Sequence, residues 1–298
     1  ANGQPIRSGF APTKNRGKVS VICLPRTRPK SRTMWSSALL GLFCSSPILC
    51  AGTVSFTNEV HGIAWATVKE VEPVSRKIHI LRWDPNVAQL RLCVPSKGPV
   101  TVSNVVEQTQ ALAGFNGSYF EIESGTPTVY LRTERKTWQG EGWDERDGGA
   151  LVWGANRTVR IKAKPSGGWG AASGSPILSS WPILVKNGQP TSFPSTPSYR
   201  ERHPRTAVAR DRAGYWYAVV VDGRSEFARG MQVTELAAWL VRNLKVDFAL
   251  GLDGGGSSTL VVRGPERLRV INHPANPGGH QRPVGNTLVL LPVVPHRE

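Results

Sequence analysis

The sequence predicts an α+β fold: a single strand-rich domain with a mixed sheet and few helices, preceded by a signal peptide. Short segments of β-branched and aromatic residues recur between Gly, Pro, Asn and Ser from Val54 onward, which is typical of strands. One segment, residues 231–244, has the apolar period of a helix. No fixed repeat and no linker interrupts residues 53–298, so we expect one domain there.

A basic leader precedes this domain. Residues 1–50 hold eight Lys or Arg and no acid, and they end in an apolar run that closes at Cys50. The run is shorter than a membrane span and is followed by a small residue, Ala51, which predicts a signal peptide over residues 1–51. Met34 precedes the run and is an alternative start of translation. We expect an exported protein, periplasmic or secreted, with no stable membrane span in its mature form; an uncleaved anchor is the alternative.

A net charge of +16 is typical of proteins that bind nucleic acids, but eight of these charges lie in the leader. The other basic residues are scattered among prolines, tryptophans and acids, and no nucleic-acid-binding motif is present. We therefore expect no nucleic-acid partner. Of the four cysteines, only Cys93 lies outside the leader, which excludes an internal disulfide and a cysteine metal site from the mature chain.

Strands and one short helix open the domain. The strands are predicted at residues 61–71, 76–84 and 88–94. The helix is predicted over residues 101–110, with Thr101 or Ser103 as its N-cap. The middle of the chain is rich in Gly, Pro and Ser, and its strands are predicted at residues 128–133, 150–154, 158–163 and 182–188.

The clearest helix stands between two strands. Residues 231–244 place apolar side chains on one face, at Val233, Leu236, Ala237, Leu240, Val241 and Leu244. The strand 215–223 precedes the helix and the strand 247–255 follows it. This order is that of a crossover unit, which joins parallel strands.

Both strands of this unit end in Asp-Gly, at Asp222 and at Asp253. If the two strands are parallel neighbours, both carboxylates lie at the same edge of the sheet, where open α/β sheets bind ligands. Either Asp-Gly taken alone is also a common turn.

The second of these turns runs on into three glycines and two serines. A Gly-rich backbone lets N–H groups approach a ligand closely, and such groups bind anions well. The hydroxyls of Ser257 and Ser258 add donors. The spacing is not that of a dinucleotide fingerprint, because the next residues read as a strand and not as a helix.

Two further polar segments precede strands or turns. His203 and Arg205 flank a proline; an Arg fork suits phosphate, and a His shuttles protons or binds a sugar hydroxyl. Asn116 stands in an Asn-Gly pair. Each segment alone is also explained as a solvated loop or a turn.

Four segments together resemble the phosphodiester glycosidase family in order and spacing. They are FNGSYF, HPRTAVARD, DGRS before the amphipathic helix, and LDGGGSSTL closed by RPVGNTLVL. The resemblance covers about residues 60–293 and is loose between 121 and 200. It implies hydrolysis of a sugar 1-phosphodiester at the glycosidic C–O bond, which releases a free sugar and a phosphomonoester.

Carried over residue by residue, the resemblance implies a pocket that combines carboxylates, one histidine and anion-binding groups. From the chemistry we predict catalytic roles for Asp253, Asp222 and His203. We predict substrate or phosphate binding by Asn116, Arg205, Gly254, Gly255, Ser257, Ser258 and Asn286. The expected partner is a sugar phosphate or a phosphodiester-linked glycan. No cofactor and no metal ligands are expected from the spacing of His, Asp and Glu, although a divalent metal stays open.

Two other classes of function stay open. A phosphodiesterase that cleaves the P–O bond would be expected to carry a di-metal His/Asp cluster, which the sequence lacks. A non-catalytic module would bind an anionic cell-wall or extracellular polysaccharide in the same pocket. The sequence does not identify the sugar, the acceptor alcohol, the stereochemical outcome or the oligomeric state.

Overall fold

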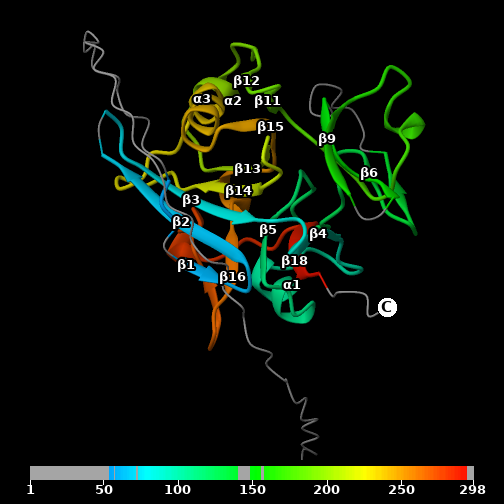
Figure 1. Cartoon of the computed structure of the whole chain (residues 1–298), viewed down its shortest axis with the longest axis horizontal. Coiled ribbons are helices and arrows are strands. Elements are labelled where there is room, and N and C mark those ends of the chain that lie inside the picture. Colours follow the sequence, from blue (N-terminus) through cyan, green and yellow to red (C-terminus); the bar gives the residue numbers. More distant parts are fainter. Residues whose placement is uncertain (1–53, 57, 72, 140–147, 156–157, 294–298) are drawn as a thin grey trace, which may run out of the picture. The chain divides into compact units, whose positions relative to one another are not determined.

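The computed structural model contains three sheets and three α-helices within the residues that it describes, which are 54–56, 58–71, 73–139, 148–155 and 158–293. The strand-rich α+β class predicted from the sequence is confirmed (Figure 1). The signal peptide predicted over residues 1–51, with Met34, lies outside the described residues.

The largest sheet has eight strands, and it carries the predicted strand–helix–strand unit. In spatial order its strands are β1 (Asn58–Val60), β2 (Ile63–Glu70), β3 (Arg76–Trp83), β14 (Trp216–Val221), β13 (Arg205–Asp211), β15 (Val246–Gly251), β11 (Ile183–Lys186) and β12 (Gln189–Pro190).

Two sheets of five strands each complete the fold. The first runs in the order β7 (Thr137–Trp138), β6 (Leu131–Arg132), β10 (Ile177–Ser180), β8 (Gly149–Trp153) and β9 (Val159–Ala163). The second runs in the order β17 (Leu268–Val270), β16 (Leu260–Arg263), β5 (Ala113–Asn116), β18 (Thr287–Pro292) and β4 (Ala88–Cys93).

The two strands that end in Asp-Gly are parallel, but they are not neighbours. Strand β13 pairs antiparallel with β14 on one side and with β15 on the other, so β14 and β15 run in the same direction with β13 between them (Figure 1). The register sets Arg205 opposite Val221 and Ala207 opposite Gly251. The expected adjacency is therefore wrong, while the expected common edge is present, because both strands end beside the start of β13.

Both predicted helices form at the predicted places. Helix α1 (Val102–Gln108) begins at Thr101, whose hydroxyl accepts the N–H of Asn104 at 3.3 Å. Helix α3 (Val233–Leu244) has a capping box between Gln232 and Glu235. The remaining helical turns are α2 (Pro197–Arg200), η3 (Trp169–Ala171), η4 (Gly255–Ser257) and η5 (Pro277–Gly279).

Apolar side chains fill both faces of the eight-stranded sheet. On one face, strands of all three sheets contribute to a shared core that includes Trp83, Phe115, Leu151 and Leu250. On the other face α3 packs with its predicted side, and Leu236 and Leu240 are buried there. Helix α1 covers the second five-stranded sheet. The ends of β13, β14 and β15 are thus held rigidly from both sides. In the described part of the chain, no helix combines the length and apolarity that crossing a bilayer requires.

Candidate active site

The glycine-rich loop between β15 and β16 lies against the start of β13. The N–H of Gly255 donates to the carbonyl of Pro204 at 2.9 Å, and Gly255 has a left-handed φ of +59°. A Cβ at Gly254 would lie 2.7 Å from the same carbonyl oxygen. A larger residue at position 254 would therefore have to displace backbone.

Pro204 also contacts the other Asp-Gly turn. A Cβ at Gly223 would lie 2.7 Å from the nitrogen of Pro204. Glycines from two different turns therefore pack on one proline, which fixes the turns after β14 and β15 relative to each other. Asp222 and Asp253 stand at the first positions of these turns.

Two guanidinium groups approach the glycine-rich loop. A Cβ at Gly255 would lie 3.0 Å from Nη2 of Arg224, and a Cβ at Gly256 would lie 2.4 Å from Nη2 of Arg282. Among the described residues, neither arginine forms an ion pair with a carboxylate. Two cationic forks beside one loop form an environment that favours a phosphate or another oxyanion.

Asn116, predicted to bind substrate, lies beneath this loop and is 1% exposed. Its Oδ1 lies 2.9 Å from the hydroxyl of Thr206 and accepts the N–H of Thr259 at 3.1 Å. Its Nδ2 donates to the main-chain carbonyl of Asp253 at 2.6 Å. Both ends of the amide are thus bonded to protein, so Asn116 ties β5 to β13 and to the loop.

Asn286, also predicted to bind substrate, is fully buried and holds the Asn-Gly-Ser turn. Its Oδ1 accepts the N–H of Ser118 at 2.7 Å, and its Nδ2 donates to the carbonyl of the same residue at 3.1 Å. A Cβ at Gly117 would lie 2.0 Å from that Oδ1. The carbonyl of Gly117 in turn accepts the N–H of Asp253 at 3.1 Å, so Asn286 supports Asp253 through one intermediate residue.

The two predicted serines differ in their surroundings. The hydroxyl of Ser258 lies 3.2 Å from that of Thr206 and belongs to the buried network under the loop. The hydroxyl of Ser257 is buried and has no hydrogen-bond partner within the described part of the chain. A buried hydroxyl is normally satisfied, so the hydroxyl of Ser257 is the exception of the two.

Asp222 is 3% exposed, and both of its oxygens are engaged by protein. Its Oδ2 lies 2.9 Å from Nε2 of His79 and 3.7 Å from Nζ of Lys77. Its Oδ1 accepts the N–H of His273 at 2.9 Å. Nδ1 of His79 lies 3.0 Å from the hydroxyl of Thr67. A hydrogen-bonded chain therefore runs from β2 through β3 to the end of β14.

Asp253 is more exposed to solvent than Asp222, since Asp253 is half-buried and Asp222 is buried. Its backbone is held on both sides, by Asn116 at its carbonyl and by Gly117 at its N–H. The fold thus gives the two carboxylates different environments at one edge of the sheet.

His203 is partly exposed, and its Nε2 lies 3.1 Å from a carboxylate oxygen of Glu201. Its Nδ1 is buried without a partner among the described residues. Burial lowers the pKa of His203 from its ordinary value of 6.5, and the neighbouring charges of Arg205 and Arg224 lower it further, whereas Glu201 acts in the opposite direction. Burial and the two arginines therefore favour the neutral form of the imidazole.

Arg205, predicted to hold phosphate, is mostly committed to the backbone. Its Nε donates to the carbonyl of Met231 at 3.0 Å, and its Nη2 donates to the carbonyls of Ser198 and Glu201 at 2.9 Å each. Burial lowers its pKa. Arg205 thus organises the segment before β13, and the guanidinium groups nearest the glycine-rich loop are those of Arg224 and Arg282.

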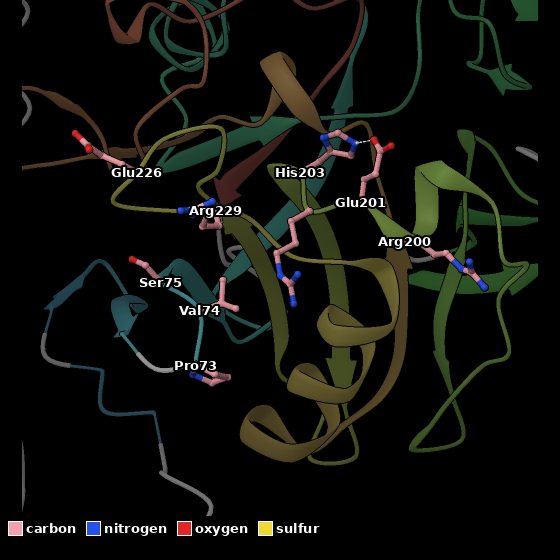
Figure 2. Close-up of a pocket in the computed structure, with 9 residues that line it drawn as sticks. Pro73, Val74, Ser75, Arg200, Glu201, His203, Glu226 and Arg229 are labelled. Atoms are coloured by element: carbon pink, nitrogen blue, oxygen red, sulfur yellow. Dashed lines mark hydrogen bonds and ion pairs between the residues drawn. The ribbon is translucent and has the colours of Figure 1, made fainter.

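A large cavity opens beside His203 and not over the glycine-rich loop. Its volume is about 750 Å³, and Figure 2 shows His203 and Glu201 paired at its wall. Its lining residues are Pro73, Val74, Ser75, Arg200, Glu201, Arg202, His203, Glu226 and Arg229. Because Pro204 follows His203 and contacts the loop, one chain segment separates the cavity from the loop.

Sequence reasoning missed His79, Arg224 and Arg282. His79 carried a signal, since it is a polar residue on the inward face of a strand, in alternation with Leu81 and Trp83. Arg224 and Arg282 lie within the DGRS and RPVGNT segments that carried the family resemblance. Among the described residues, no group of three or more His, Cys, Asp or Glu side chains is arranged to hold a metal.

The family model for phosphodiester glycosidases matches residues 109–291. The chain is also 45% identical over 60 residues to N-acetylglucosamine-1-phosphodiester alpha-N-acetylglucosaminidase of Bos taurus, a match that covers 20% of this chain and 11% of that protein.

Three solved structures share the fold. The catalytic domain of the zebrafish N-acetylglucosamine-1-phosphodiester alpha-N-acetylglucosaminidase, auto-inhibited by its pro-peptide, has a TM-score of 0.61 and 18% identity, over 80% of this chain and 86% of that one. A hypothetical protein from Synechocystis has a TM-score of 0.57 and 16% identity, over 81% and 64%. A putative exported protein from Burkholderia pseudomallei has a TM-score of 0.52 and 18% identity, over 73% and 74%.

Proposed function

The chain belongs to the phosphodiester glycosidase family, and on that basis we propose that it hydrolyses the glycosidic C–O bond of a sugar 1-phosphodiester. The bond from the anomeric carbon to the phosphate oxygen breaks, and an oxygen of water finally bonds to that carbon, either directly or after a carboxylate of the protein has first bonded there. The bonding electron pair stays on the phosphate, and a proton from water balances the charge. The products are a free sugar and the phosphomonoester of the second alcohol.

The observation that carries the proposal is the pair of guanidinium groups at the glycine-rich loop. Arg224 and Arg282 converge on Gly255 and Gly256, where a departing phosphate gains negative charge. Preorganised donors at the point where charge develops stabilise the transition state more than the ground state. Ser257, in the same loop, has a buried hydroxyl without a hydrogen-bond partner among the described residues.

We assign the carboxylate that serves the anomeric carbon to Asp253. An oxocarbenium-like transition state needs a carboxylate close by, which acts as the nucleophile or as the base for water. Asp253 is half-buried at the point where β15 passes into the loop, whereas Asp222 is only 3% exposed. Asp253 is thus the carboxylate placed to meet a substrate. Proton NMR of the first-formed anomer distinguishes the two roles, because the nucleophile route retains configuration.

His203 stands between the loop and the cavity, and in its neutral form it serves the alcohol side of the diester. Its Nε2 faces the carboxylate of Glu201, so Nδ1 of the neutral ring is the acceptor. This Nδ1 has no partner among the described residues, and it suits a hydroxyl donor. The alcohol portion of the substrate would extend past His203 into the cavity of about 750 Å³. That volume is in the range of small-molecule sites.

The names of the relatives suggest the sugar and the cell compartment. The bovine and zebrafish proteins act on N-acetylglucosamine 1-phosphodiesters according to their names, and the same sugar is our first candidate here. The basic leader with its apolar run supports export to the periplasm or the medium. One of the structural relatives carries the description of an exported protein.

The test is hydrolysis of a panel of sugar 1-phosphodiesters, beginning with N-acetylglucosamine, in water enriched in heavy oxygen. Mass analysis of both products locates the label. Label in the sugar establishes C–O cleavage and supports the proposal. Label in the phosphate identifies a phosphodiesterase instead. Binding of a phosphodiester polysaccharide without turnover of any substrate identifies a binding module.

A further inference from the structure

A segment that follows β17 crosses the glycine-rich loop; we call this segment, residues 272–282, the strap. Asn272 at its start accepts the N–H of Leu260 at 2.8 Å and donates to the carbonyl of Ser258 at 3.0 Å. Asn276 donates to the carbonyl of Gly256 at 2.8 Å. The strap thus binds two backbone positions of the loop and the first residue of β16 before it delivers Arg282 to Gly256.

The strap is fixed by contacts outside the loop as well. Gln281 exchanges two hydrogen bonds with Ser103 of α1, at 2.6 and 3.1 Å. At the other end, the N–H of His273 donates to Oδ1 of Asp222 at 2.9 Å. Asp222 therefore connects the end of β14 to the segment that carries Arg282.

The carboxylate of Asp222 is also contacted by two side chains of β3, those of His79 and Lys77. A carboxylate only accepts hydrogen bonds, so the proton of the His79 ring lies on Nε2, which faces Oδ2 at 2.9 Å. In the neutral ring, Nδ1 then accepts from the hydroxyl of Thr67 at 3.0 Å. His79 is fully buried, and Lys77 lies 3.7 Å from the same carboxylate oxygen. These contacts fix the position and the orientation of the carboxylate.

We propose that His79 and Asp222 form a positioning pair that fixes the strap and thereby places Arg282 at the glycine-rich loop. The inference rests on the proposed function in one respect, namely that the group which Arg282 meets is the phosphate of a phosphodiester. Asp222 then acts through the strap, and the carboxylate that meets the anomeric carbon is Asp253 alone.

A double-mutant cycle tests this coupling. The variants of the full chain are Asp222→Asn, Arg282→Gln and the double variant, and the readout is the affinity for glycerol 3-phosphate measured by titration calorimetry. The amide nitrogen that Asp222→Asn introduces would face the N–H of His79 or the N–H of His273, so the variant breaks one contact of the pair. Arg282→Gln is expected to weaken binding about tenfold, as for the loss of one hydrogen bond to a charged group. Asp222→Asn is expected to weaken binding comparably, with no further loss in the double variant.

A second pair of variants guards against simple loss of folding. His79→Gln keeps an amide N–H that reaches Asp222, and it should preserve most of the affinity for glycerol 3-phosphate. His79→Leu should lose affinity to the same extent as Asp222→Asn. Asp247→Asn, which removes an exposed pairing with Arg212, is the matched control and should change nothing. Each variant is first checked for a native denaturation midpoint.

The outcomes separate the inference from the proposed function. Additive losses in the cycle would overturn the positioning pair. So would an Asp222→Asn enzyme whose kcat falls while its KM and phosphate affinity stay unchanged, because that pattern marks a group that acts only in the transition state. A non-additive cycle in a protein that hydrolyses no sugar phosphodiester would uphold the positioning pair and reject the proposed function.

Discussion

The amide of Asn116 donates a 2.6 Å hydrogen bond to the main-chain carbonyl of Asp253. A side chain at the end of β5 thus fixes the backbone of the residue that stands where β15 passes into the glycine-rich loop. Because the same amide accepts the N–H of Thr259, one buried residue holds both ends of the loop.

Replacing Asn116 with Leu should destabilise the fold and disturb the loop together. The change leaves the N–H of Thr259 and the carbonyl of Asp253 buried without this partner, and each such group costs about 1 to 3 kcal/mol. We expect the free energy of unfolding in urea to fall by about 2 to 5 kcal/mol. The control is the exposed Asn86; Asn86→Ala should change stability by less than about 0.5 kcal/mol. If both substitutions lowered the free energy of unfolding equally, Asn116 would not stabilise the loop as described.

Asp253→Asn should abolish turnover while leaving binding intact. The amide keeps the shape of the side chain but removes the charge that an oxocarbenium-like transition state requires. We expect kcat to fall by about a thousandfold or more, with KM changed by less than about threefold. The matched control is Asp247→Asn, near the start of β15, the strand that ends just before Asp253. A loss confined to KM would show that Asp253 only binds substrate.

The pKa of His203 provides a pH prediction with a definite sign. Burial holds it below 6.5 in the folded protein, so the unfolded chain binds more protons as the pH falls through 6.5 and then below. His203 therefore lowers the free energy of unfolding as the pH falls below about 7. Above about pH 7 it has no such effect. An NMR titration of the His203 ring should give a pKa below 6.5. Glu201→Gln should lower the pKa further, and Arg224→Gln should raise it; shifts in the reverse directions would contradict the contacts described.

Gly256→Ala should weaken phosphate binding more than folding. A Cβ at Gly256 would lie 2.4 Å from Nη2 of Arg282 and 2.4 Å from Oδ1 of Asn276, so both side chains have to move, and both are side chains and not backbone. The displaced guanidinium no longer meets the phosphate, so the affinity for glycerol 3-phosphate should fall about tenfold. Gly170→Ala is the control, because a Cβ there meets no atom within 4 Å. Retention of full affinity in Gly256→Ala would show that Arg282 does not contact the ligand.

Local sequence patterns predicted the elements of the fold well. The i, i+3, i+4 pattern of residues 233–244 became α3, and Thr101 became the N-cap of α1. These features depend on neighbours within a few residues, which a single sequence displays. The position of β13 in the sheet does not depend on such near neighbours. The tight turn between Asp211 and Tyr215 folds β13 back along β14, so β13 occupies the place beside β14 that the crossover unit assigned to β15.

The roles predicted for the site residues stay predictions. The side-chain hydrogen bonds of Asn116, Asn286 and Arg205 go to protein, and of the three only Asn116 bonds to the ends of the glycine-rich loop. Roles depend on which side chains meet across distant strands, and those meetings are set by register. His79 and Asp222 are 143 positions apart in the chain, and no local pattern connects them.

Pro204 separates the two Asp-Gly turns and contacts a glycine in each, Gly223 and Gly254. The three positions therefore form a single steric constraint, although they are spread over three segments of the chain. A homologue with a larger residue at one turn should also carry a compensating change at the proline or at the other turn. Substitutions at Pro204, Gly223 and Gly254 therefore have to be made together if the loop is redesigned for a different ligand.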